Sequence, residues 1–369
     1  MEPKQMQLGG TVCDPCHPVN GPPVATGRGR AGRAGPEERT GDDGRVLLYD
    51  DVVTEYRDFA TYAAGDSPCF EEWALGVAGD EEVLAWLGTL PPIKRQPNLV
   101  FAAARWHGAP APGPYDGLRR VLREQEPAVR ETVMARATQT NEVGRLATLA
   151  PVLGLVVGPL ALVVVGASAG LCLFPDRYDY DWSPAGTLRG SGGPLLTARA
   201  TGPLPVPSAH PDVAWRGGVD LNPLDVTDAD ATAWRENLVW PEQDERRDRL
   251  RAAIEVARTD PPAVRSGDLL DHLPDLLDEA APHGTPVVFH SAVIAYLEEP
   301  DRERFHDLMT GLVAVGRCRW ISNEGRRVLP RVLPRVTGGR ETPSGRFVTA
   351  LDGVPLAYSH GHGHAIDWL

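Results

Sequence analysis

The stretch ALVVVGASAGLCLF, residues 161–174, decides the fold because it joins a β-branched apolar run to a loop of small residues. Residues 160–165 have the length and composition of a buried central strand. The loop from Gly166 to Gly170 follows at once. That arrangement suits a glycine loop that holds a nucleotide-like cofactor, a serine nucleophile on a sharp turn, or part of a membrane helix.

The membrane interpretation is the first to test. No charged residue occurs between Leu146 and Phe174, a run longer than the roughly 20 residues of a membrane-spanning helix. Gly158 and Pro159 divide this run into a segment with apolar residues at helical spacing and a segment of strand composition. We therefore expect a buried helix followed by a buried strand, and a soluble protein without a membrane partner.

Composition restricts the class of protein further. With 369 residues and 42% hydrophobic content the chain is typical of a soluble globular protein. Its net charge of −13 argues against a general nucleic-acid binder. Residues 1–45 are rich in Gly, Arg and Pro, which predicts a disordered tail. The five scattered cysteines favour a reducing, cytoplasmic location.

The remainder divides into two parts. Residues 46–157 carry apolar positions three and four apart, which predicts an all-helical cap of four to six helices. Residues 158–369 alternate strand and helix patterns, with a Gly/Pro-rich insertion at 176–214. The alternation predicts an α/β domain with a mostly parallel sheet, and a terminal hairpin turning at Asp352-Gly353 adds an antiparallel edge.

Chemically useful residues stand where four predicted strands end, which is where open α/β sheets bind ligands. Glycine allows close approach of a ligand to backbone, and a carboxylate can accept hydrogen bonds from two hydroxyls. In chain order these residues are the loop Gly166, Ala167, Ser168 and Gly170, then Asp220 and Asn222, then Gly267 and Asp268, and finally His290 and Ser291.

This order resembles the class I S-adenosylmethionine-dependent methyltransferases over roughly residues 160–369, and implies their Rossmann-like sheet. The resemblance implies that the glycine loop with Asp220 and Asn222 binds S-adenosylmethionine and that Gly267 and Asp268 lie by the adenine. It also implies that His290 faces the acceptor as a general base. The usual acid two residues before the first glycine is replaced by Val164.

Candidate substrate residues surround the same strand ends. Asn141 and Glu142 belong to a polar cluster directly before the first strand, where they either hold a small-molecule substrate or link the cap to the sheet. Ser291 and Tyr296 come at and after the end of the fourth strand, although Tyr296 fits a core or interface aromatic better than a substrate contact. His360, His362 and His364 alternate with glycine, but no local Cys or acid completes a metal site, so we predict none.

Two other functions stay open. Ser168 stands at the centre of Gly-x-Ser-x-Gly, so a serine hydrolase with Asp268 or Asp352 and a C-terminal histidine is an alternative. A non-catalytic protein that retains the methyltransferase fold is another, and Val164 is the main observation for it.

A narrower resemblance covers most of residues 50–369. The segments ATQTNEVGR, VGASAGL, GVDLNPLDV, LVWPE and VVFHSAVIAYL are similar to a bacterial family known as domain of unknown function 2332. That resemblance implies a shared fold and names no reaction.

Overall fold

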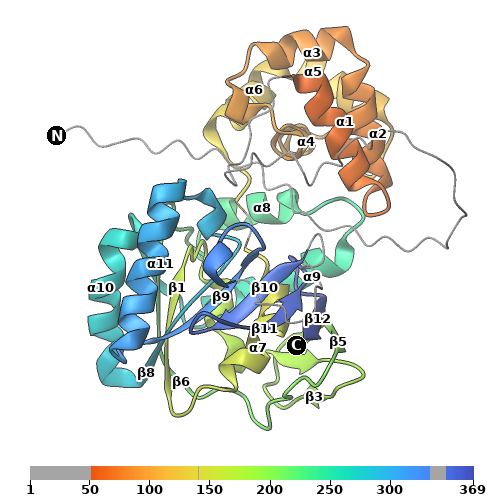
Figure 1. Ribbon diagram of the computed structural model, residues 1–369. Helices are drawn as coiled ribbons and strands as arrows, with labels where there is room; N and C mark the ends of the chain where they lie inside the picture. Colours follow the sequence, from red (N-terminus) through yellow and green to blue (C-terminus); the bar gives the residue numbers. More distant parts are fainter. Residues whose placement is uncertain (1–50, 140, 333–345) are drawn as a thin grey trace, which may run out of the picture.

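The computed structural model describes residues 51–139, 141–332 and 346–369. The predicted tail, residues 1–45, lies outside these ranges. The described chain forms a helical part followed by a large sheet with helices on both faces, and α8 (Ala229–Leu238) lies between the two (Figure 1). The protein is therefore of the α/β class with an N-terminal helical region, as the sequence predicts.

Six α-helices make up the helical part. Side chains that precede α1, α2 and α3 cap their first turns: Asp51, Ser67 and Asp80 each accept a hydrogen bond from a backbone N–H. Large aromatic side chains fill the core between the helices, with Trp73 and Phe101 fully buried. The helices are α1 (Val52–Ala63), α2 (Pro68–Ala78), α3 (Glu81–Gly88), α4 (Pro97–Trp106), α5 (Tyr115–Glu124) and α6 (Glu126–Ala135).

A nine-stranded sheet forms the second part, in the order β5-β12-β11-β10-β9-β8-β1-β6-β7. The five strands from β7 to β9 run parallel, and each of the pairs β9–β10, β10–β11 and β11–β12 is antiparallel. The edge strand β5 pairs in parallel with β12. The strands are β1 (Leu160–Val165), β5 (Arg199–Thr201), β6 (Val213–Asp220), β7 (Ala263–Ser266), β8 (Thr285–Ser291), β9 (Arg319–Gly325), β10 (Phe347–Leu351), β11 (Val354–Ser359) and β12 (Ala365–Trp368).

Strand β1 lies inside the sheet, between β6 and β8, as its apolar sequence predicts. After β1 and the insertion, the chain forms β6 on one side of β1, and later it forms β8 on the other side. The strand order therefore reverses between β1 and β8. In open α/β sheets the crevice beyond the carboxyl ends of the strands at such a reversal is the usual ligand site.

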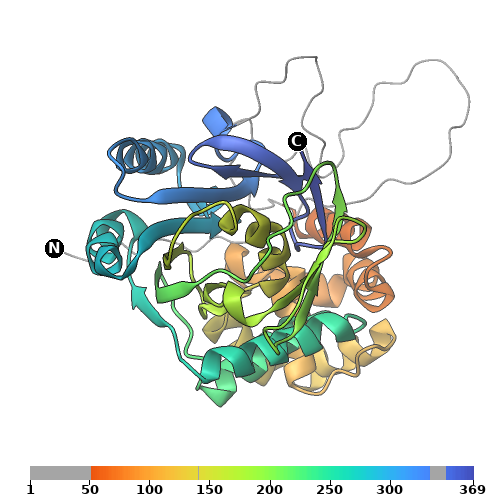
Figure 2. The ribbon, with the colours of Figure 1, turned by 90° about the horizontal axis from the view of Figure 1, so that it is seen from below.

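Two helical layers cover the sheet, and β1 contributes to both because successive side chains of a strand alternate. Leu162 and Val164 pack with α7 (Leu146–Leu153) and α9 (Asp244–Arg258). Val163 and Val165 pack with α10 (Leu269–Ala280) and α11 (Glu299–Ala314). Figures 1 and 2 both show α10 and α11 side by side. Helix α7 thus belongs to the core of the sheet, although residues 46–157 read as one helical cap from the sequence.

The Gly/Pro-rich insertion, residues 176–214, is ordered against the sheet. It contributes a small second sheet of β3 (Thr187–Leu188), β2 (Asp179–Asp181) and β4 (Leu195–Thr197). Its last strand, β5, extends the main sheet by pairing with β12. Trp182 is fully buried and donates a hydrogen bond from Nε1 to the Ala147 carbonyl at 2.6 Å, which ties the insertion to α7.

The helical part is docked on α8 and the turn that follows it. Trp240 lies within the helical core, where its ring contacts those of Phe59 and Phe70. The Arg105 guanidinium donates at 2.8 Å to the backbone carbonyls of Asn237 and Val239. These contacts make α8 a shared element, so a side chain on α8 is positioned by both parts of the protein.

The uncharged run from Leu146 to Phe174 is divided as predicted into helix α7 and strand β1, and both elements are buried, whereas most of the connection at 154–159 is exposed. Across the three described ranges, no helix combines the length and the apolar character that crossing a membrane requires.

The position of β1 generates a stability prediction. Leu162→Ala should lower the free energy of unfolding by about 2–5 kcal/mol, because it leaves a cavity between β1 and its covering helices. The matched control is Val157→Ala, since Val157 is 87% exposed just before the strand, and it should cost no more than about 0.5 kcal/mol. Denaturant unfolding of both variants measures this. Equal losses for the two would contradict the central position of β1.

Candidate functional site

The loop after β1 adopts a conformation that requires its glycines. Gly166, Ser168 and Gly170 have φ of 69°, 53° and 68°, in the left-handed region that glycine tolerates best. A Cβ on Gly166 would lie 2.4 Å from Val293, and one on Gly170 would lie 2.5 Å from Pro262. Ala167 and Ser168 are buried as well. The glycines therefore serve the packing of the protein, and the loop is a rigid internal support at the strand ends.

Asp220, the last residue of β6, holds this loop in place. Its Oδ2 accepts a hydrogen bond from the Ser168 backbone N at 2.8 Å. Its Oδ1 accepts from the Asn222 backbone N at 2.8 Å and from Nε2 of Gln139 at 3.3 Å. Gln139 also donates to the Asn222 carbonyl. The structure thus brings together Ser168, Asp220 and Asn222, as predicted, and adds Gln139 from the connection out of the helical part.

Arg235 on α8 reaches the same loop. Its Nη1 donates to Oγ of Ser168 at 3.1 Å, and only 4% of the residue is exposed. Burial lowers the pKa of the guanidinium to about 10, against the opposing effect of the nearby Asp220 carboxylate, so it is charged at neutral pH. No hydrogen-bond partner in the described chain contacts its Nε or Nη2. Sequence reasoning missed this residue, because one arginine on a helix carries no signal of burial.

Asn141 and Glu142 link the connection after α6 to the loop after β1 and to α9. Oδ1 of Asn141 accepts from the Leu171 backbone N at 2.9 Å. The buried carboxylate of Glu142 accepts from Nε of Arg246 at 2.7 Å and contacts Nη2 of Arg249 at 3.4 Å. Burial alone would raise its pKa, but Arg246, Arg249 and His362 outweigh it and lower the pKa to about 2. Both side chains are thus occupied by protein partners.

Gly267, directly after β7, donates its backbone N–H to the Asp220 carbonyl at 3.0 Å. The end of β7 therefore lies beside Asp220. Gly267 has φ of 149°, and a Cβ there would lie 2.2 Å from the His272 ring. Asp268 is the N-cap of α10 and accepts from the Leu270 backbone N at 2.8 Å. One of its carboxylate oxygens therefore caps the N-terminus of α10.

Ser168, Asp220 and Asn222, at the ends of β1 and β6, form what we call the strand-end site. His290 does not reach this site, contrary to the expectation that it faces an acceptor. The ring is fully buried, its Nδ1 lies 2.7 Å from Oε1 of Glu324, and its Nε2 accepts from Nε1 of Trp320 at 3.0 Å. The cause is the alternation of β8: His290 shares a face with Val288, which packs beneath α10 and α11. Both ring nitrogens are engaged, so this histidine has a structural place in the core.

Ser291 and Tyr296 differ in their surroundings. Oγ of Ser291 accepts from Nδ2 of Asn323 at 2.9 Å, and Asn323 in turn accepts from Thr349 and Ser359. Ser291 thus belongs to a polar network across β8–β11. Tyr296 is 41% exposed and therefore lies at the surface after β8, not in the core.

The three C-terminal histidines lie close together, with the ring centroids of His360 and His364 3.4 Å apart. Within the part of the chain that the structure describes, no group of three or more His, Cys, Asp or Glu side chains is arranged to hold a metal ion.

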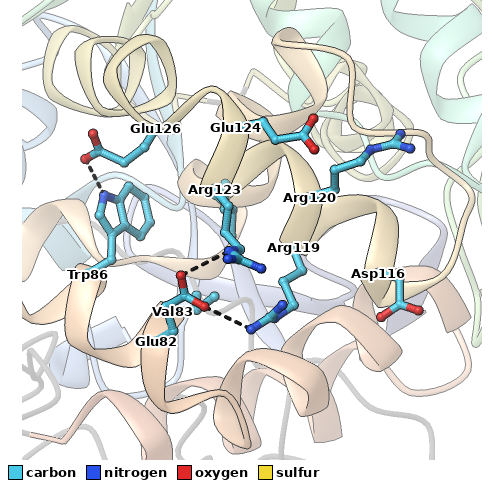
Figure 3. A pocket seen from close by; sticks show the side chains of 10 residues that line it. Glu82, Val83, Trp86, Asp116, Arg119, Arg120, Arg123, Glu124 and Glu126 are labelled. Atoms are coloured by element: carbon cyan, nitrogen blue, oxygen red, sulfur yellow. Dashed lines mark hydrogen bonds and ion pairs between the residues drawn. The ribbon is translucent and has the colours of Figure 1, made fainter.

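Two hollows are relevant to ligand binding. A groove of about 700 Å³ lies in the helical part, far from the strand ends. Figure 3 shows Glu82 between Arg119 and Arg123, with which it forms ion pairs, and Glu126 bonded to Trp86. A second, much smaller cavity of about 30 Å³ lies between the connection at residues 139–143, α8 and α9, and two of its lining residues, Gln139 and Arg235, bond to Asp220 and Ser168. Its lining residues are Gln139, Asn141, Glu142, Val143, Arg235, Leu238, Val239, Arg246 and Leu250.

The charge of Glu142 generates a pH prediction. A folded-state pKa of about 2, against 4.5 for an unperturbed glutamate, means that ionised Glu142 stabilises the fold above about pH 4.5 and that this is lost as the pH falls toward 2. Glu142→Gln should cost roughly 3 kcal/mol at pH 7, and the difference from wild type should shrink below pH 4.5.

The matched control is Glu236→Gln, because Glu236 forms a more exposed pair with Arg251 and should contribute at most about 1 kcal/mol. Denaturant unfolding at several pH values measures both. A gap between wild type and Glu142→Gln that is as large at pH 3 as at pH 7 would contradict the assignment.

Comparison with known proteins gives one match. The family model described as "Uncharacterized protein conserved in bacteria (DUF2332)" matches residues 53–368. No curated protein and no solved structure matches the chain. Because the family model covers both the helical part and the sheet, the chain belongs to this uncharacterized bacterial family.

Proposed function

We propose that the protein is an S-adenosylmethionine-dependent methyltransferase that acts on a small molecule, with its cofactor at the carboxyl ends of β1, β6 and β7. The observation that supports this most is the Asp220 carboxylate, which lies at the end of the second parallel strand and is bonded at 2.8 Å to the loop after the first. A carboxylate in that position can accept both hydroxyls of a ribose.

The surroundings of Asp220 fit a nucleoside. Asp220 is partly exposed, and the bond from Gln139, at 3.3 Å, is the longest of its three. A ribose hydroxyl can replace this neutral amide without disturbing the two backbone N–H donors. Leu221 follows directly and is 37% exposed, so it offers apolar surface next to the carboxylate, where the flat face of a base can pack.

When bound, S-adenosylmethionine supplies a methyl group on a sulfonium, which a nucleophile can take without covalent help from the protein. The chain has to hold the nucleoside, orient the acceptor and limit water, and such positioning provides much of the acceleration in reactions of this kind. In this proposal Asp220 performs the first task, and the Gly166–Gly170 loop supports its carboxylate through the Ser168 backbone N–H. His290 performs none of them, because its ring is in the core.

The serine hydrolase alternative has less support. A nucleophilic serine needs a neighbouring base that can take its proton. The side-chain partner of the Ser168 Oγ is Arg235, whose guanidinium stays protonated in proteins and cannot act as a base. No observation favours this second function, and we do not propose it.

Calorimetric titration with S-adenosylmethionine and S-adenosylhomocysteine tests the proposal. Wild type should bind both, and Asp220→Ala should weaken binding at least tenfold, because each lost charge-assisted hydrogen bond costs roughly 1.5–3 kcal/mol. The matched control is Asp225→Ala, since the Asp225 carboxylate bonds only to the nearby Thr227 among the described contacts, and this change should leave affinity unchanged.

Thermal melting shows whether Asp220→Ala remains folded, and Asp220→Asn, which preserves the side-chain shape, serves if it does not. Absence of binding by wild type, or equal affinity of wild type and the folded Asp220 variants, would refute the proposal. Binding without turnover on any acceptor would favour a non-catalytic protein that retains the fold.

A further inference from the structure

The small cavity between the connection at residues 139–143, α8 and α9 is lined by an incompletely paired cation. This cation is Arg235 of α8, of which only 4% is exposed. Leaving buried polar groups without partners is costly, and more so when the group is charged. Such a group in a folded protein therefore requires an explanation, and one explanation is a ligand.

The orientation of the guanidinium is specific. Ser168 occupies Nη1 at 3.1 Å, while Nε and Nη2 lack hydrogen-bond partners in the described ranges. Nε and Nη2 donate in the same direction, and together they form the edge of arginine that binds a carboxylate through two parallel hydrogen bonds. The glycine loop thus binds Nη1 of the guanidinium, and the bidentate edge formed by Nε and Nη2 has no hydrogen-bond partner in the described chain.

The carboxylates nearby are committed to other donors. Glu142 lines the cavity but is bound by Arg246 and Arg249. Asp220 is close enough to favour the charged form of Arg235, yet its carboxylate accepts hydrogen bonds from Ser168, Asn222 and Gln139. Arg249 also has a buried Nε without a partner in the described chain. Positive charge is therefore in excess here, in a chain whose net charge is −13.

We propose that Arg235 binds the carboxylate of a small-molecule ligand in this cavity. The volume of about 30 Å³ has room for about two water molecules, which matches the two oxygens of a carboxylate and is too small for a whole metabolite. Leu238, Val239 and Leu250 form apolar walls, and a low dielectric strengthens the ion pair. The amides of Gln139 and Asn141 lie at the same cavity and provide polar surface beside the carboxylate.

This site does not depend on the proposed reaction, and it can be tested with acetate as the probe. Nitrogen-15 spectra of the arginine Nε–H groups are recorded on the full chain at constant ionic strength, while sodium acetate or the neutral analogue acetamide is added. The peak missing in Arg235→Gln identifies Arg235. It should shift with acetate in a saturable manner in the millimolar range, and should not respond to acetamide.

Two variants complete the test. Arg235→Lys preserves the charge but cannot form the bidentate pair, so calorimetry should show weaker acetate binding. This variant also keeps the test available if Arg235→Gln fails to fold. Arg251→Gln removes an exposed arginine of α9 and should leave the acetate response unchanged. An Arg235 peak that does not shift, or that responds equally to chloride or acetamide, would overturn the proposal, as would equal acetate affinity of wild type and Arg235→Lys.

The carboxylate has two possible sources, the amino-acid end of the methyl donor or a separate acceptor. S-adenosylhomocysteine carries that carboxylate, whereas methylthioadenosine lacks it. If Arg235→Gln loses at least tenfold in affinity for S-adenosylhomocysteine but not for methylthioadenosine, the methyl donor supplies the carboxylate. If acetate binding is lost while both nucleosides bind as in wild type, a separate ligand supplies it. Failure of both nucleosides to bind wild type would refute the methyltransferase proposal and leave the acetate result intact.

Discussion

The Asp220 carboxylate joins three segments that are far apart in the chain. It accepts from the loop after β1, from the residues directly after β6, and from Gln139 at the end of the helical part. These segments meet because β1 and β6 are adjacent parallel strands whose carboxyl ends lie together. The same loop is held from the other side by Arg235 of α8, which the helical part positions. The strand-end site therefore depends on both parts of the protein, and Asp220 is its centre.

Most of the architecture could be predicted from local pattern. The run of six apolar residues at 160–165 identified the buried strand β1, and Gly158-Pro159 separated it from α7. Alternation of strand and helix then predicted the parallel sheet with an antiparallel hairpin. What local pattern could not predict was long-range pairing: the insertion strand β5 joins β12 at the far end of the chain, and α7 packs on the sheet despite following six cap helices.

The site residues divide in the same way. Ser168, Asp220 and Asn222 stand at strand ends and meet there, because the fold alone brings such positions together. His290 also ends a strand, but its side chain follows the alternation of β8 into the core. Alternation in the sequence could not show this, because Val287, Val288 and Phe289 are all apolar and buried. The burial of Arg235 depends on how α8 packs between the two parts, so no spacing in the sequence indicates it.

We propose that the strand ends around Asp220 form a ligand-binding site. A crystal structure of the protein grown with S-adenosylhomocysteine tests this most directly. We expect electron density for the ribose at the Asp220 carboxylate, with the bond from Gln139 displaced. Density in the charged groove of the helical part instead, or none at Asp220 at saturating ligand, would contradict it.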